Sequence, residues 1–223
     1  MVLIGCYPIS LDKNGFEIRV QEWDYLDGTH VKETVTYVVM EPGSYTLEDG
    51  TKVEAGMFET DKIKRFEAVS FSQSFQEIPV VTTSILSINE ADAVTGRIRN
   101  IDTRGFDFRM QEQEQNRKKH ITEIIGYIAW EPSEGTIDSL TFEINKTSAS
   151  VKHNFYTIQF AQNFVKTPMF IADMQTGNSM DTANVRWQNK DAYAVEVQID
   201  EEQSKNKEIN HKTEVVGYMV FSK

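Results

Sequence analysis

The sequence predicts an all-β fold of tandem antiparallel β-sandwich modules, about six strands each, with an incomplete first copy. Three observations support this prediction. Segments such as "FEIRV", "FDFRM" and "VEVQI" alternate apolar and polar residues, as half-buried strands do. No window shows a sustained apolar stripe of helical period. One sequence unit also recurs at a spacing near 90 residues, which indicates a repeat protein.

Three strand-like phrases make the repeat visible. They read "ETVTYVVMEP" (residues 33–42), "EIIGYIAWEP" (123–132) and "EVVGYMVFSK" (214–223), at spacings of 90 and 91 residues. The phrase "GFEIRVQEW" at Gly15 likewise recurs as "GFDFRMQEQ" at Gly105. Short strands separated by regular turn signals are typical of antiparallel sandwiches and barrels.

The repeat divides the chain into three parts. We expect residues 1–57 to hold the C-terminal half of a first repeat plus a connector hairpin. Residues 58–150 would hold the second repeat with its connector, and residues 151–223 the third. The connectors, at 44–58 and 135–150, are too apolar for flexible linkers, so they are interpreted as short hairpins.

The first copy is only half a unit. A half-sandwich leaves an apolar face and strand edges uncovered. We therefore expect this copy to continue upstream in the native protein; the alternative is that its half-sheet docks on a neighbour. Cys6 is expected in a strand of this copy, and because it is the only cysteine, it excludes an intramolecular disulfide framework.

The phrase at residues 123–130 predicts a central strand. Period two places Glu123, Ile125 and Tyr127 on one face and Ile128 and Trp130 on the other. Both faces are apolar after the glutamate, which indicates a strand buried on both sides of its sheet.

A histidine precedes each of these strands, in "HVKE" (His30), "HITE" (His120) and "HKTE" (His211). In an extended strand, residues three apart point to opposite faces. A metal site or proton relay shared by His120 and Glu123 would therefore need a bend. We interpret the histidines as markers of the loop-to-strand entry, with ligand contact as the alternative.

An acidic or amide-rich turn follows the alternating strand in each copy. The turns read "QEWDYLDG" (residues 21–28), "QEQEQN" (111–116) and "DEEQSKN" (200–206). Carboxylate and amide groups beside an aromatic ring suit a neutral sugar, since they bind hydroxyls while the ring packs on the apolar sugar face. Trp23 with Asp24 is the one such pair; a solvated acidic rim is the alternative.

Arg97 and Arg186 occupy equal positions on the strand that precedes the alternating strand. Either could pair with the nearby Glu112 or Glu201, or present its planar fork to a ligand. The candidate carbohydrate-binding residues are Trp23, Asp24, Arg97, Glu112, Gln113, His120, Arg186, Glu201, Glu202 and His211.

Composition and missing motifs narrow the function classes. The net charge of −11 argues against nucleic acid, because phosphate binding depends on clustered Lys and Arg. The apolar runs are about a third of the roughly 20 residues that a membrane-spanning helix needs, so no membrane insertion is expected. No nucleophile elbow, P-loop or dinucleotide-binding motif is present, so no enzyme activity is predicted. Two carboxylates that are distant in sequence but close in the fold could still catalyse glycoside hydrolysis, so this alternative stays open.

No cofactor is predicted. The oxygen-rich turns have ligand types that suit Ca²⁺. However, the sequence contains no loop of the EF-hand or glycine-aspartate nonapeptide type. We therefore expect neither a metal nor another cofactor.

The unit resembles the H-type lectin domain. The resemblance rests on "FQEIPVV" (residues 75–81), the "GF" turns at Gly15 and Gly105, and "IGYIAWE" (125–131). It implies a six-stranded antiparallel β-sandwich that usually trimerises and binds N-acetylgalactosamine and related sugars. It covers most of each unit.

The resemblance also bears on the site residues. Trp23 and Asp24 match the family's tryptophan and adjoining polar sugar contact. The family's sugar-binding arginine has no match, since its position holds Ala93 in the second copy and Thr182 in the third. The two complete copies also lack the aromatic residue, which weakens the expected sugar specificity more than the expected fold.

Together these features predict a non-catalytic, lectin-like tandem module for multivalent recognition of glycan or polysaccharide. The alternatives are an adhesin stalk repeat that binds no small ligand, and an accessory module of a polysaccharide-degrading enzyme. The resemblance implies a homo-oligomer, which in this family is usually a trimer, and a role in cell adhesion. We expect an extracellular or cell-surface location, because such acidic repeats with little cysteine resemble modules of large bacterial surface or secreted proteins.

Overall fold

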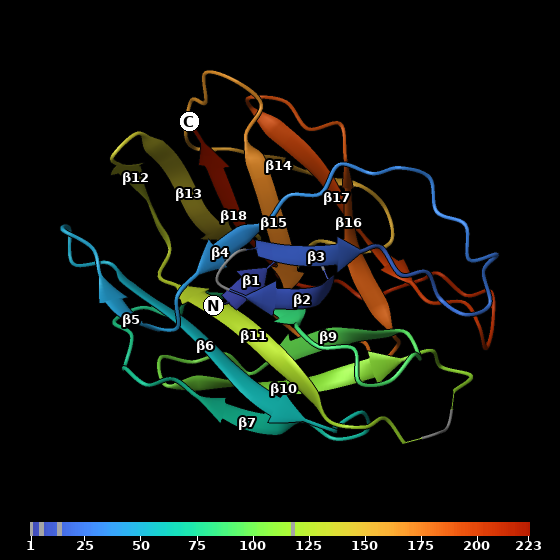
Figure 1. Ribbon diagram of the computed structural model, residues 1–223. Coiled ribbons are helices and arrows are strands. Elements are labelled where there is room, and N and C mark those ends of the chain that lie inside the picture. Colours follow the sequence, from blue (N-terminus) through green and yellow to red (C-terminus); the bar gives the residue numbers. More distant parts are fainter. Residues whose placement is uncertain (1, 5–6, 13–14, 117–118) are drawn as a thin grey trace.

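The computed structural model describes residues 2–4, 7–12, 15–116 and 119–223, and it confirms the all-β prediction (Figure 1). The described residues form 18 antiparallel strands and no helix. Accordingly, this part of the chain holds no helix that could cross a membrane. Cys6, expected in a strand, lies outside the described residues.

The middle sandwich comprises β5 to β11. Its strands are β5 (Gly43–Thr46), β6 (Lys52–Thr60), β7 (Glu67–Ser70), β8 (Val80–Ile85), β9 (Val94–Arg99), β10 (Gly105–Glu112) and β11 (Glu123–Trp130). One sheet has the order β5-β6-β11-β8 and the other β7-β10-β9. The expected connector hairpin is thus part of this sandwich, and it brings the strand number to seven.

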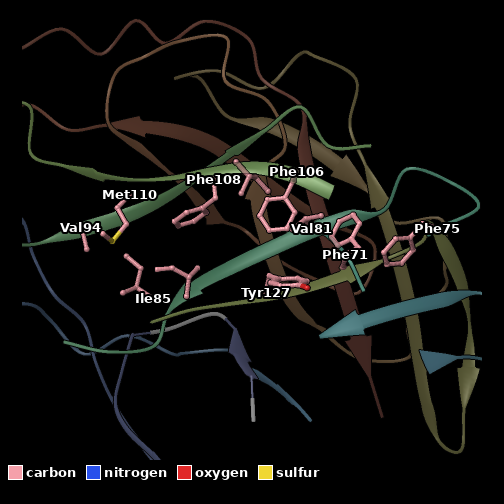
Figure 2. Packing of buried hydrophobic residues seen from close by; sticks show 12 residues of the cluster. Phe71, Phe75, Val81, Ile85, Val94, Phe106, Phe108, Met110 and Tyr127 are labelled. Carbon is pink, nitrogen blue, oxygen red and sulfur yellow. The ribbon is translucent and has the colours of Figure 1, made fainter. Parts of the chain in front are cut away.

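Aromatic and aliphatic side chains fill the space between these two sheets (Figure 2). Phe106 and Phe108 of β10 lie in one buried cluster with Ile125, Tyr127 and Ala129 of β11, as alternation predicts. The ring centroids of Phe106 and Tyr127 are 5.4 Å apart in an edge-to-face arrangement. This cluster is the core of the middle sandwich.

The C-terminal sandwich, β12 to β18, repeats the same plan. Its strands are β12 (Ser133–Ile137), β13 (Leu140–Lys146), β14 (Tyr156–Gln159), β15 (Met169–Met174), β16 (Ala183–Gln188), β17 (Ala194–Glu201) and β18 (Val216–Ser222). The sheet orders, β12-β13-β18-β15 and β14-β17-β16, match those of the middle sandwich strand for strand. The sequence repeat is therefore a structural repeat.

The N-terminal unit has four short strands: β1 (Val2–Ile4), β2 (Tyr7–Asp12), β3 (Gly15–Arg19) and β4 (Val38–Met40). They form two sheets, β1-β4 and β2-β3. The ring of Phe16 in β3 contacts the ring of Tyr37, the residue just before β4, edge-to-face with 4.8 Å between centroids. In Figure 1 this unit (dark blue) lies in front of the two sandwiches.

A further core joins the units to each other. The outer faces of the sheets that contain β11 and β18 pack together through buried residues such as Ile128, Trp130 and Phe221, with Val38 and Met40 of β4 packed against them. The predicted central strand is therefore confirmed: β11 pairs with β6 and β8 and is buried on both faces.

Side chains of the C-terminal sandwich also cover the edge of β8. Gln175 both donates to Val81 O (2.8 Å) and accepts from Val81 N (2.9 Å). Asp173 accepts from the backbone N–H of Thr83 at 3.1 Å. These contacts satisfy groups that an open edge strand leaves unpaired, so they fix the relative position of the two sandwiches.

Candidate functional site

The three acidic turns, far apart in sequence, meet at one place. Each turn contacts both of the others through at least one hydrogen bond. The bonds run from Gln113 Nε2 to Asp24 Oδ2 (2.7 Å), from Glu114 N to Glu202 Oε2 (2.8 Å) and from Gln203 N to the hydroxyl of Tyr25 (3.2 Å). The turns of the N-terminal unit and the two sandwiches therefore form a closed ring of polar groups.

Behind each turn, one histidine bridges two glutamates. His120 lies 3.0 Å from Glu112 through Nδ1 and 3.2 Å from Glu123 through Nε2. The same arrangement recurs twice: His211 contacts Glu201 (2.6 Å) and Glu214 (3.3 Å), and His30 contacts Glu22 (2.9 Å) and Glu33 (3.5 Å). The expectation that His120 and Glu123 lie on opposite faces is wrong, because the strand begins only at Glu123 and the chain bends before it.

In the two sandwiches, the glutamate three residues after the histidine also holds a loop. Glu123 accepts hydrogen bonds from the backbone N–H groups of Asn89 (3.0 Å) and Glu90 (3.2 Å). Glu214 does the same for Asn178 (2.9 Å) and Ser179 (3.0 Å). The repeated histidine motif therefore anchors the loop after β8 or β15, which agrees with the scaffold interpretation.

Burial and charge shape the titration of these carboxyls. Burial raises the pKa of Glu112 and of Glu201, although a hydrogen bond from His120 or His211 opposes the change. Burial acts in the same direction on Glu214. There, the His211 hydrogen bond and the charge of Arg97 outweigh burial and lower the pKa below its usual value.

The two arginines at equal repeat positions have different surroundings. Arg97 is 1% exposed and donates from Nη2 to Glu214 of the C-terminal sandwich at 2.6 Å. Arg186 is exposed and pairs with Asp200 on the neighbouring strand at 3.3 Å. The pairing interpretation therefore holds for both, with partners other than the expected Glu112 and Glu201.

Arg186 lines an open cleft of about 750 Å³ between the N-terminal unit and the C-terminal sandwich. Two tryptophans, Trp23 and Trp187, are among the residues that line the cleft, together with His30 and Asp200. A concave surface of this size with aromatic walls and a few polar groups is typical of ligand sites.

Of the ten predicted site residues, the structure brings Trp23, Arg186 and Glu201 to this cleft. Asp24 is exposed in the ring of turns, where it binds Gln113. The others have buried side chains: Arg97, Glu112, Gln113, His120, Glu202 and His211.

Sequence reasoning missed Trp187, an exposed indole on β16. It occupies the repeat position of Ile98, which is fully buried on β9. An aromatic residue in place of an aliphatic one at a repeat position was the signal that could have identified it. Its ring lies edge-on to Phe170 of β15, with 6.5 Å between centroids, and Trp187 is also among the residues that line the cleft.

One acidic cluster lies next to the ring. Asp181, Glu201 and Glu208 each place one carboxylate oxygen within 4.8 Å of the other two. One Glu201 oxygen already binds His211. Carboxylate oxygens are the ligands that Ca²⁺ takes, but acidic groups at a surface also cluster without an ion, so the cluster assigns no metal.

Comparisons with known proteins agree with this architecture. Residues 67–130 match the family model of the H-type lectin domain, which confirms the resemblance for the middle sandwich. The chain is 30% identical over 217 residues to Halomucin from Haloquadratum walsbyi; the alignment covers 96% of this chain and 2% of that protein. No solved structure matches significantly.

Proposed function

Because residues 67–130 are an H-type lectin domain, and the same unit recurs along the chain, we propose that the protein is a non-catalytic carbohydrate-binding module. Its glycan site is the cleft between the N-terminal acidic turn and strands β16 and β17. One observation carries the proposal: Trp23 and Trp187 border the same cleft as Arg186 and Asp200. Indole faces bind the apolar faces of sugar rings, and planar charged groups bind pairs of hydroxyls.

The charges around the cleft favour a neutral sugar. Glu22, Glu33 and Asp200 line it together with Lys32 and Arg186. The Arg186 guanidinium already pairs with Asp200 at 3.3 Å, and the whole chain carries a net charge of −11. A negative surface repels anionic glycans, so the ligand class is a neutral saccharide.

The equivalent place at the boundary between the two sandwiches is filled. There, the buried Arg97–Glu214 pair occupies the place that Arg186 and Glu33 border in the open cleft. Of these two boundaries, only the one between the N-terminal unit and the C-terminal sandwich has an open cleft. We therefore expect one glycan per chain at this cleft, instead of one per repeat.

A glycan array followed by calorimetric titration tests the proposal. Trp23→Ala and Trp187→Ala should each weaken binding of the selected neutral glycan by about tenfold or more, because an aromatic anchor in a ligand site contributes at least about 1.4 kcal/mol. Tyr193→Ala is the matched control, since this exposed aromatic does not line the cleft. The proposal fails if the unmodified chain binds no glycan, or if the control weakens binding equally.

We also infer an extracellular or cell-surface location and a role in adhesion. The 30% identity to Halomucin supports this inference. The lectin domain supports it too, because glycans are displayed on cell surfaces and in secreted material. The partner in this role is a glycan or polysaccharide.

A further inference from the structure

The N-terminal unit exposes side chains whose repeat equivalents are core residues of the sandwiches. Tyr37 is 46% exposed and Val39 is 38% exposed. Their equivalents in the middle sandwich, Tyr127 and Ala129, are 5% and 0% exposed. The same side chains are therefore buried in the middle sandwich and exposed in the N-terminal unit. Large exposed apolar patches usually mark a surface that another molecule or segment covers.

The two sheets of this unit also have open edges. Strand β4 pairs only with β1, whereas its equivalents β11 and β18 each have neighbours on both sides. Strand β3 pairs only with β2, whereas β10 and β17 again have two neighbours. Within the described ranges, therefore, the N-terminal unit has no strands equivalent to β6 and β7.

In the middle sandwich, residues 43–75 cover the equivalent face. Phe58 and Phe71 lie against the ring of Tyr127, with centroids 6.3 Å and 6.1 Å away. Glu54 accepts the Tyr127 hydroxyl hydrogen bond at 2.7 Å. The covering segment therefore supplies both apolar rings and a buried acceptor.

The covering segment supplies a backbone acceptor as well. The N–H of Met110 donates to Lys62 O at 2.8 Å, and the N–H of Ile199 donates to Lys152 O at 2.8 Å. Val20 is the equivalent residue in the N-terminal unit, and its side chain is 49% exposed. This backbone contact is therefore present in both the middle and the C-terminal sandwich.

We propose that the open face of the N-terminal unit is a docking surface for a polypeptide segment of this same repeat type, equivalent to residues 43–75. The segment adds one strand at the edge of β4 opposite β1 and another at the edge of β3 opposite β2. Backbone pairing provides affinity in such strand addition, and the pockets for alternate side chains provide specificity. Here the pockets are those that take the counterparts of Glu54, Phe58 and Phe71.

The repeat register fixes the design of a test. Val2 pairs with Met40 as Val80 pairs with Trp130, so Val2 holds the place of Val80. A duplicate of residues 43–78 fused directly in front of the chain therefore keeps the natural spacing. In the control extension, the duplicated segment carries Phe58→Ser, Phe71→Ser and Phe75→Ser.

Amide hydrogen exchange of the full chain is the readout. The native-sequence extension should slow exchange at Val20 and in β4 by about tenfold or more, because these groups pass from an open edge to a paired one. The control extension should leave exchange unchanged, and the amides of β18 serve as the internal reference in both proteins.

Three results would overturn the proposal. The first is an extension that leaves these amides unprotected, and the second is equal protection by the control extension. The third is a concentration-dependent dimer of the unextended chain that protects the same amides, since a second copy would then be the occupant. Because Val20 also lines the glycan cleft, exchange is measured without sugar, and the cleft is tested separately by sugar titration.

Discussion

At the scale of single residues, Arg97 and Arg186 show how one repeat position acquires two roles. Both follow from the same sequence pattern, yet Arg97 meets Glu214 of another unit at 2.6 Å and Arg186 borders an open cleft. Burial lowers the pKa of the Arg97 guanidinium, and the charges of Glu214 and Asp173 oppose the change. Arg97 therefore depends on its partners, whereas Arg186 is hydrated.

Removing each arginine should have unequal effects on stability. Arg97→Ala leaves Glu214 charged, buried and without its cation, so we expect a loss of about 3–5 kcal/mol in the free energy of unfolding. Arg186→Ala removes an exposed pair and should lose at most about 1 kcal/mol. Urea unfolding of the two variants measures the difference.

A double variant separates lost charge from lost shape. Arg97→Met with Glu214→Gln removes both charges of the buried pair together, so stability should recover part of the Arg97→Ala loss. Equal losses for Arg97→Ala and Arg186→Ala would contradict the role assigned to the buried pair.

At the scale of the element, β11 and the residue that follows it carry three polar anchors, four residues apart. Glu123, Tyr127 and Glu131 all hold loops or strand ends of the middle sandwich. Glu131 accepts from the backbone N–H of Lys52 (2.8 Å) and Glu77 (3.0 Å). The strand is therefore both the centre of the sheet and the fixing point of the loops at its two ends.

Tyr127→Phe tests one of these anchors. Burial, together with the hydrogen bond to Glu54 and its charge, raises the pKa of the Tyr127 hydroxyl, so the group stays protonated and donates. Its loss should lower the free energy of unfolding by about 1.5–3 kcal/mol, as expected for a hydrogen bond to a charged group. Tyr37→Phe is the matched control, because this equivalent tyrosine is 46% exposed. Thermal unfolding that shows no difference between the variants would disprove the anchor.

At the scale of the whole molecule, the units share one core. Trp130 of the middle sandwich packs against Phe142 and Phe221 of the C-terminal sandwich, with centroids 5.3 Å and 6.0 Å apart. Val38 and Met40 of the N-terminal unit lie against the same cluster. The chain is therefore not a string of independent modules, because each unit buries an outer face against the others.

Cooperative unfolding follows from this shared core. The chain should unfold in a single calorimetric transition, and Trp130→Ala should lower its stability by about 3–5 kcal/mol. Protection of amides in β18 should fall together with that in β11. Tyr193→Ala, at an exposed site, should change stability by no more than about 0.5 kcal/mol. Two separate transitions, with only one shifted by Trp130→Ala, would show that the sandwiches unfold independently.

Much of the fold could be predicted from local pattern. Alternation identified β3, β10 and β17, and the two-sided apolar phrase identified β11 as a central strand. These predictions succeed because strand periodicity and burial are properties of consecutive residues. The bend at His120 could not be predicted this way, since it depends on the two glutamates that the histidine bridges.

The sequence by itself determined the β architecture, the repeat and the resemblance to the H-type lectin domain. Each of these depends on residues that are close in sequence or recur at a constant spacing. Only the tertiary structure decided which repeated residues are enclosed and which border a cleft. Arg97 and Arg186 hold equal places in the repeat, but Arg97 meets Glu214 of the C-terminal sandwich and Arg186 borders the cleft beside the N-terminal unit. Burial and charge partners come from the unit across the boundary, and no single repeat encodes that neighbour.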